Sequence, residues 1–229
     1  MRFVTLHPSK QQKPIGKVLC LGRNYVDHAR EMNSPIPESP IVFLKPATAV
    51  ITQGDAVVIP PFSHEVHHEV EMVVLLGRDG KDISRSSALD YVAGYGIGLD
   101  MTLRDVQAEA KKQGLPWSVA KGFDTSAPVS TIVEKEQVGN PHELDITLKV
   151  NGKIRQKSNT RNMIFTVDYV VSYLSSIFTL EAGDLVFMGT PEGVGAVRPG
   201  DILEAELGSV CSLRVDVQSA VAVPFSGST

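Results

Sequence analysis

The stretch HHEVEMVVLLG at residues 67–77 is the most informative part of the sequence. Its second half is apolar and β-branched, which is typical of a buried strand and not of an exposed helix. Side chains two residues apart in a strand share a face, so Glu69 and Glu71 are expected to project side by side. Two carboxylates entering a buried strand are unfavourable unless a cation compensates them. The alternative is an exposed strand end with two solvated glutamates, and this pattern alone does not decide between the two.

Asp100 supplies a third carboxylate. It ends the run YGIGLD at residues 95–100, and a helical pattern follows it. A strand end that leads into a helix is a common place for a functional site, although an aspartate there can also be a plain N-cap. Three carboxylates without a thiolate select a hard cation, so we expect Mg²⁺ or Mn²⁺, with Ca²⁺ as a further candidate.

An overlapping segment offers a competing interpretation. HEVHH at residues 64–68 matches H-E-x-x-H, in which one helix brings two histidines together on zinc. Here Pro60 and Pro61 come shortly before His64, and the apolar strand follows His68 directly. A helix is therefore disfavoured, and a zinc metallopeptidase is the weaker interpretation.

Glycine and proline separate short β-rich runs through most of the chain. We expect strands at residues 56–59, 70–76, 144–150, 185–188, 202–207 and 212–217, and a hairpin turn at Asn151-Gly152. Helices are expected at residues 24–32, with Asn24 as N-cap, at 103–113 and at 164–176. Three Gly-Asp pairs, at 54–55, 183–184 and 200–201, are interpreted as turns and not as ligands. The pattern predicts one α+β domain in which β structure predominates.

Composition narrows the class of protein. With 229 residues, 42% apolar and 21% charged, the chain has the make-up of a soluble globular protein. A net charge of −4 argues against nucleic acid as a partner, and no apolar run is long enough to cross a bilayer. The N-terminus resembles neither a signal peptide nor a transit peptide, so we expect a cytoplasmic protein. Cys20 and Cys211 are expected to be core residues and not a disulfide.

A polar segment at residues 22–31 carries candidate acid–base groups. On a helix, His28 and Glu31 are three residues apart and can touch. A carboxylate that holds one imidazole nitrogen orients the ring and raises its basicity, which suits activation of water. Spacing alone favours the alternative, a surface histidine in a helical ion pair. Pro35 and Pro37 follow, so the segment is a candidate lid.

Three further groups of polar residues allow two interpretations each. Arg104, Gln107 and Lys111 form one stripe on the predicted helix, either facing a substrate or solvated. Lys121 follows an apolar run and is either a buried positive group or a lysine that extends to solvent. The loop GTPEGVG at residues 189–195 either presents N–H groups to an anion or forms a plain turn.

Together these motifs resemble the fumarylacetoacetate hydrolase family, most closely its single-domain acylpyruvase and oxaloacetate decarboxylase branch. The resemblance covers about residues 17–218, with motifs in the same order: GRNY at 22–25 with His28, HEVE at 68–71, LD at 99–100, RDVQ at 104–107, the stretch 117–124 and GTPEGVG at 189–195. It implies a mixed β-roll, with an N-terminal arm at residues 1–16 and one catalytic domain at 17–229, and it implies a homodimer.

The resemblance also implies roles for individual residues. Mg²⁺ or Mn²⁺ would bind Glu69, Glu71 and Asp100. His28 and Glu31 would form a catalytic dyad on a segment that orders over the substrate, and Lys121 would stabilise negative charge. Contacts to substrate would come from Arg23, Lys45, Arg104, Gln107 and Thr190.

The implied substrate is a small keto acid. We expect hydrolysis of the C–C bond of an acylpyruvate, such as acetylpyruvate or fumarylpyruvate, to pyruvate and a carboxylic acid through a metal-bound pyruvate enolate. Oxaloacetate decarboxylation and keto–enol tautomerisation would use the same enolate and are alternatives. We place hydrolysis first because His28 and Glu31 suit activation of water. Two other classes stay open: the zinc metallopeptidase, and a non-catalytic organic-acid-binding protein that would keep the metal without the dyad.

Overall fold

The computed structural model describes residues 1–220, so residues 221–229 of the expected domain lie outside the described part. Its centre is an eight-stranded mixed sheet with the order β2 (Gln12–Pro14), β1 (Phe3–His7), β12 (Ile132–Glu134), β9 (Val92–Leu99), β8 (Val70–Leu76), β15 (Leu185–Phe187), β3 (Val18–Gly22) and β4 (Ile41–Lys45). β1 pairs with β12 and with β2, so the first residues of the chain contribute two strands to this sheet.

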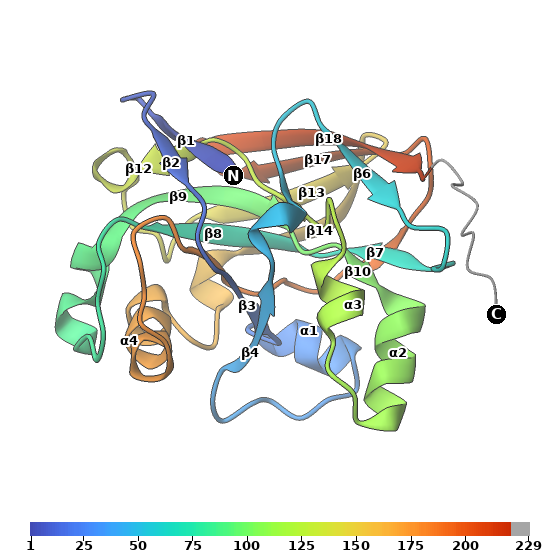
Figure 1. Ribbon diagram of the computed structural model, residues 1–229, viewed down its shortest axis with the longest axis horizontal. Helices are drawn as coiled ribbons and strands as arrows, with labels where there is room; N and C mark the ends of the chain where they lie inside the picture. Colours follow the sequence, from blue (N-terminus) through green and yellow to red (C-terminus); the bar gives the residue numbers. More distant parts are fainter. Residues whose placement is uncertain (221–229) are drawn as a thin grey trace.

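A second sheet packs against the first and gives the molecule its curled, predominantly β shape (Figure 1). Its five strands are β14 (Lys153–Asn159), β13 (Asp145–Val150), β17 (Ile202–Leu207), β18 (Cys211–Ser219) and β6 (Ala56–Ile59). Two small sheets complete the roll: β10 (Thr102–Leu103), β7 (Val66–His68) and β16 (Gly195–Val197) in one, β11 (Ala127–Pro128) and β5 (Val50–Ile51) in the other.

Helices lie along the open side of the central sheet (Figure 1). In residues 1–220 the α-helices are α1 (Val26–Glu31), α2 (Arg104–Gln113), α3 (Ser118–Gly122) and α4 (Val167–Ile177). Short 3₁₀ helices occupy Ala47–Ala49, Arg85–Tyr91, Lys135–Gln137 and Thr160–Asn162. None of the described helices combines the length and the apolar character that a membrane crossing requires.

The strand β8 is buried along its whole length, as its continuous apolar run predicts. It pairs antiparallel with β9, and Glu71 lies opposite Gly98. A Cβ atom at Gly98 would lie 2.8 Å from the ring of Phe187, so only glycine allows this close packing. The two central strands therefore form a rigid platform, and β9 brings Asp100 to the same end of the sheet as Glu69.

Most expected turns and strands are confirmed. Asn151 and Gly152 have φ of 52° and 74°, the left-handed pair that a type I′ hairpin between β13 and β14 needs. In each Gly-Asp pair the aspartate accepts the N–H of the residue three positions earlier, as when Asp201 accepts the Arg198 N–H at 2.7 Å. The strands predicted at 56–59, 70–76 and 202–207 have the predicted bounds, and the others shift at their ends. Both cysteines are free.

The predicted cap of the first helix is wrong. Tyr25, not Asn24, is the residue that flanks α1, and no side chain caps the helix. The carboxamide of Asn24 accepts the Phe165 N–H at 2.7 Å and donates to the carbonyl of Met188 at 2.8 Å. The third helix begins at Val167, three residues later than expected. Long-range hydrogen bonds thus replace a local preference for capping.

Two further interpretations of the sequence are contradicted. Residues 66–68 of the H-E-x-x-H match form the strand β7, so His64 and His68 do not meet on a helix and the zinc interpretation fails. Asp100 is not a helix cap, because β10 separates it from α2, whose N-cap residue is Leu103. The α2 helix itself ends as predicted at Gly114, which has a left-handed φ of 68°.

Candidate active site

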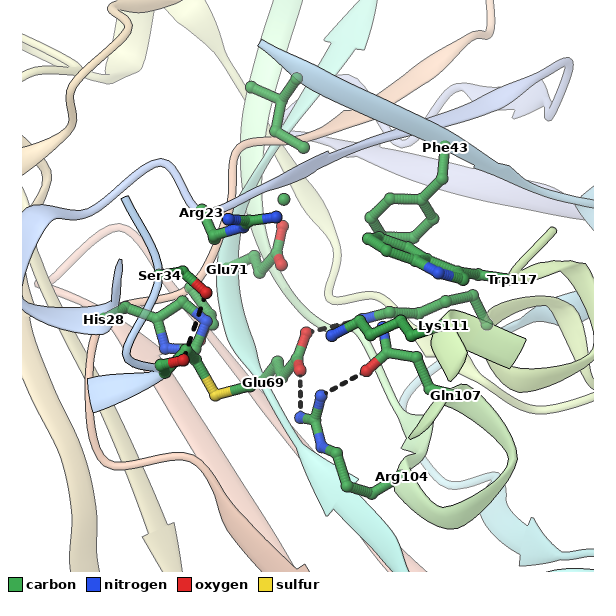
Figure 2. A pocket seen from close by; sticks show the side chains of 15 residues that line it. Arg23, His28, Ser34, Phe43, Glu69, Glu71, Arg104, Gln107, Lys111 and Trp117 are labelled. Carbon is green, nitrogen blue, oxygen red and sulfur yellow. Dashed lines mark hydrogen bonds and ion pairs between the residues drawn. The ribbon is translucent and has the colours of Figure 1, made fainter. Parts of the chain in front are cut away.

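A cavity opens between the ends of the central strands and the helices α1, α2 and α3 (Figure 2). Its lining comprises Leu21, Gly22, Arg23, His28, Met32, Ser34, Phe43, Glu69, Glu71, Arg104, Gln107, Lys111, Trp117, Lys121 and Thr190. The lining includes every residue expected at the site except three. Glu31 is exposed and contacts His28, whereas Lys45 and Asp100 are buried and pair with each other.

Three buried carboxylates converge at the floor of this cavity. One ligand oxygen from each of Glu69, Glu71 and Asp100 lies within 4.8 Å of the other two. Glu69 occupies the break between β7 and β8, Glu71 lies on β8, and Asp100 follows β9. The Asp100 N–H donates to the Glu69 carbonyl at 2.8 Å, which extends the β8–β9 pairing and holds the two acids together. The predicted convergence is therefore confirmed, and the solvated alternative is excluded.

Buried cations surround two of these carboxylates. The ammonium of Lys121 lies 2.7 Å from Glu69 Oε2 and 2.5 Å from Asp100 Oδ2. Arg104 pairs with Glu69 Oε1 at 2.5 Å, and Lys45 Nζ lies 2.8 Å from Asp100 Oδ1. Lys121 is thus a buried charge and not a surface lysine. Burial acts to raise the pKa of Glu69, but the charges of Lys121 and Arg104 hold it below its ordinary value.

Glu71 is in a different position. It accepts the Gly189 N–H at 2.6 Å and has no cationic side chain within 4.0 Å among residues 1–220. Burial, and then the neighbouring charges of Asp100 and Glu69, raise its pKa well above the ordinary value. An ionised Glu71 therefore lacks a cation in direct contact among residues 1–220.

The donor set fits a hard divalent cation. Three carboxylate oxygens at this spacing are the ligands that Mg²⁺ and Mn²⁺ prefer. The buried Oδ1 of Asp100 has no hydrogen bond. Lys45 is close to it, at 2.8 Å, but its ammonium is directed at the carbonyls of Met101 and Ser126, so the contact is ionic and not an aligned hydrogen bond. The site therefore offers an incompletely satisfied carboxylate set.

His28 lines another wall of the cavity (Figure 2) and pairs with Glu31. His28 Nδ1 is 3.2 Å from Glu31 Oε2, and the histidine is buried. The second oxygen of Glu31 accepts the N–H of Gly193 at 3.0 Å. With Nδ1 held by the carboxylate, Nε2 of His28 is left as the basic nitrogen. The structure thus forms the contact that the spacing predicts, and the burial of His28 contradicts the alternative of a surface histidine.

The glycine-rich loop presents its N–H groups to acids of the protein itself. Gly189 binds Glu71 and Gly193 binds Glu31, so one loop holds a candidate ligand and a candidate catalytic group. Thr190 lies between them, buried, and its hydroxyl accepts the Gln156 side-chain N–H at 2.8 Å. The loop therefore does present N–H groups to anions, and the anions are the carboxylates of Glu71 and Glu31.

The polar stripe of α2 faces the cavity. Arg104, Gln107 and Lys111 all line it, and Arg104 donates to the Gln107 side-chain oxygen at 2.7 Å. Lys45, expected as a substrate contact, is instead enclosed behind Asp100, where its ammonium meets main-chain carbonyls. It is a partner of Asp100 and does not line the cavity.

Sequence reasoning missed several residues of the site. Phe43 and Trp117 form an aromatic wall with ring centroids 6.0 Å apart, and Met32 and Ser34 line the rim. Gln156 lies on β14 and joins the β7–β8 segment to the loop at Thr190. Phe43 is an ordinary core residue type and gives no signal, whereas Trp117 begins the stretch 117–124 that carries the family resemblance but was given no role at the site.

A curled β-roll that buries three carboxylates beside a His–Glu pair has the organisation of an enzyme active site. Comparison with known families assigns it: the chain belongs to the fumarylacetoacetate hydrolase family, whose model "Fumarylacetoacetate (FAA) hydrolase C-terminal" matches residues 17–218.

Individual relatives give a finer comparison. The chain is 51% identical to the rat (Rattus norvegicus) protein named oxaloacetate tautomerase FAHD1, mitochondrial, over 88% of this chain and 91% of the relative. It is 44% identical to the Arabidopsis thaliana protein of the same name, over 90% and 92%. Among solved structures, the fumarylpyruvate hydrolase of Pseudomonas aeruginosa in complex with Mn²⁺ and pyruvate superposes with a TM-score of 0.90 and 42% identity, covering 96% of both chains.

Proposed function

We propose that this protein is a divalent-metal-dependent enzyme that interconverts the keto and enol forms of oxaloacetate. The observation that carries the proposal is the convergence of Glu69, Glu71 and Asp100 beside a cavity that Glu69, Glu71 and His28 line. Relatives named oxaloacetate tautomerases, at 44–51% identity and over most of their length, support this choice of reaction. Tautomerisation therefore takes precedence over the hydrolysis that we expected first.

The residues of the chain supply a base and a stabilised anion site. His28, with its Nδ1 proton held by Glu31, takes the C3 proton of the keto form at Nε2. The electron pair of the C–H bond forms the C2–C3 double bond, and the charge moves to the C2 oxygen, where the Lys121 ammonium stabilises it. A proton from solvent then completes the enol at this oxygen, and His28 gives the proton it took to solvent. In the reverse direction His28 returns the proton to C3.

The remaining polar groups position the substrate. Arg104, Gln107 and Thr190 line the cavity and offer donors to carboxylate oxygens. Mg²⁺ or Mn²⁺ bound by the three acids would supply Lewis-acid polarisation of the keto acid. Phe43 and Trp117 exclude water from one side, which strengthens these electrostatic contacts.

Acylpyruvate hydrolysis is the second candidate, and the His28–Glu31 pair favours it. The same base can take a proton from water, which would attack the distal carbonyl and leave the pyruvate enolate. The likeness to a fumarylpyruvate hydrolase supports this activity as well. Decarboxylation of oxaloacetate leaves the same enolate when the C3–C4 bond breaks, so all three reactions draw on one site.

An assay of three substrates separates the candidates. Decay of enol-oxaloacetate is followed by ultraviolet absorbance, and pyruvate release is followed from oxaloacetate, acetylpyruvate and fumarylpyruvate, each with Mg²⁺ or with EDTA. We expect metal-dependent decay of the enol that exceeds pyruvate release, and its loss in His28→Ala but not in the exposed control His64→Ala. Full tautomerase activity in His28→Ala would refute the role of this base, and pyruvate release without enol decay would favour hydrolysis or decarboxylation.

Assembly and location stay predictions. The family resemblance implies a homodimer, which sedimentation of the purified protein tests directly. The N-terminus predicts a cytoplasmic location, but the rat and Arabidopsis relatives are named mitochondrial proteins. Fractionation of the source cells decides it.

A further inference from the structure

The charges around the carboxylate cluster are nearly balanced before any ion or substrate binds. Glu69 pairs with Arg104 and Lys121, and Asp100 pairs with Lys121 and Lys45. A divalent cation at this site therefore adds positive charge in excess of these pairs. An anionic substrate is the natural complement of that excess.

Lys111 adds a further positive charge at the rim of the cavity. It lies in the last turn of α2, one turn beyond Gln107, and lines the cavity. No carboxylate lies within 4.0 Å of its ammonium among residues 1–220. The residue is exposed at the rim, and partial burial, followed by the charges of Arg104 and Arg23, lowers its pKa. This is an ammonium without an acidic partner beside a site for keto acids.

The position of Lys111 is defined by an aromatic neighbour. Its Nζ lies 5.1 Å from the centroid of the Trp117 ring, a cation–π contact that restricts the flexible side chain. Figure 2 shows Lys111, Gln107 and Trp117 on one side of Glu69, with His28 on the other. A substrate whose reacting end lies between Glu69 and His28 can therefore direct its far end toward Lys111.

We infer that Lys111 binds the distal carboxylate of the substrate and so selects keto dicarboxylates over keto monocarboxylates. This inference rests on the proposed function, because it takes the keto-acid end to lie at the carboxylate cluster. A charge-assisted hydrogen bond contributes about tenfold or more in affinity. Acylpyruvates with an uncharged acyl group would lack this contact, whereas oxaloacetate and fumarylpyruvate would make it.

Binding of two matched ligands tests the inference without relying on turnover. We would titrate 2-oxoglutarate and 2-oxovalerate, which share the keto-acid end and differ in the distal carboxylate, into the Mn²⁺-loaded protein by calorimetry. The variants are Lys111→Met, which keeps the apolar stem, and Lys111→Arg, which keeps the charge. Lys112→Met is the matched control, because the neighbouring residue is equally exposed but does not line the cavity.

We expect the wild-type protein to bind 2-oxoglutarate about tenfold more tightly than 2-oxovalerate. Lys111→Met should abolish this difference while leaving the affinity for 2-oxovalerate unchanged, and Lys111→Arg should largely restore it. Equal loss for both ligands in Lys111→Met, or an unchanged preference, would overturn the inference and leave the proposed function intact. Failure of the wild-type protein to bind either keto acid with Mn²⁺ present would overturn both.

Discussion

Glu31 accepts the backbone N–H of Gly193 at 3.0 Å while its other oxygen lies 3.2 Å from Nδ1 of His28. The helix that carries the histidine is therefore tied to the glycine-rich loop, far away in sequence. The same loop holds Glu71 through the N–H of Gly189 at 2.6 Å. A single loop thus sets the position of the base relative to the carboxylate cluster.

Substitution of Gly193 should disconnect these groups. Gly193 has a φ of +93°, and a Cβ atom there would lie 2.2 Å from the Arg155 carbonyl. We expect Gly193→Ala to lower kcat at least tenfold, because the loop must shift and Glu31 loses its donor. Gly200→Ala is the control: its φ is +94°, but nothing lies within 4 Å of the added atom.

Gly200→Ala should lose about 1–2 kcal/mol of unfolding free energy from left-handed strain, and Gly193→Ala should lose more, because its Cβ atom also meets the Arg155 carbonyl. Only Gly193→Ala should lose activity beyond that. Thermal unfolding and steady-state kinetics on the two proteins measure this, and similar kcat values for both would show that the loop does not position the base.

The carboxylates of the cluster should differ in their contribution to folding. Asp100→Asn leaves Lys45 and Lys121 without a shared counter-charge, and breaking a buried pair of this kind destabilises by about 3–5 kcal/mol. Glu71→Gln removes a carboxylate that has no cationic partner and that Asp100 and Glu69 repel, so it should be nearly neutral in the metal-free protein. Chemical denaturation in EDTA tests the contrast, and equal destabilisation would contradict the charge pairing.

Gln156 should act through Thr190. Its side-chain oxygen accepts the Val70 N–H at 3.0 Å, so its NH₂ group faces the Thr190 hydroxyl and the Pro191 carbonyl. Because the Thr190 oxygen accepts this bond, the hydroxyl proton is free to point into the cavity. We expect Gln156→Met and Thr190→Val each to lower kcat/KM about tenfold, with little further loss in the double variant.

The double-mutant cycle needs all four proteins to be folded, which circular dichroism establishes at the assay temperature. Removing Gln156 leaves the buried Val70 N–H without an acceptor, which should lower the free energy of unfolding by about 1–3 kcal/mol. Losses in kcat/KM that multiply would show that Gln156 and Thr190 act independently, and the positioning role would be wrong.

The sequence predicts those parts of the site that follow from short-range geometry. The two-residue period of a strand places Glu69 beside Glu71, the helical period places His28 beside Glu31, and the stripe of α2 places Arg104 beside Gln107. The strand β8 and the α2 helix follow from apolar runs and end signals for the same reason.

What sequence does not reveal depends on long-range packing. Lys45 meets Asp100 only because β4 and the end of β9 meet at the same edge of the roll, and Gln156 meets Thr190 only because β14 folds over the loop. Asn24 loses its capping role to partners more than a hundred residues away, such as Phe165. Tertiary hydrogen bonds outweigh local propensity at such positions.

The most direct test of the central claim is a calorimetric titration of Mn²⁺ into the wild-type protein, Glu71→Gln and the exposed control Glu65→Gln. We predict one ion per chain for the wild type and the control. Glu71→Gln should bind Mn²⁺ about 100-fold more weakly or not at all. Substitution of a residue that only supports a metal ligand already lowers metal affinity by about 10- to 100-fold. Equal affinity and stoichiometry for Glu71→Gln and the wild type would contradict a metal site on Glu69, Glu71 and Asp100.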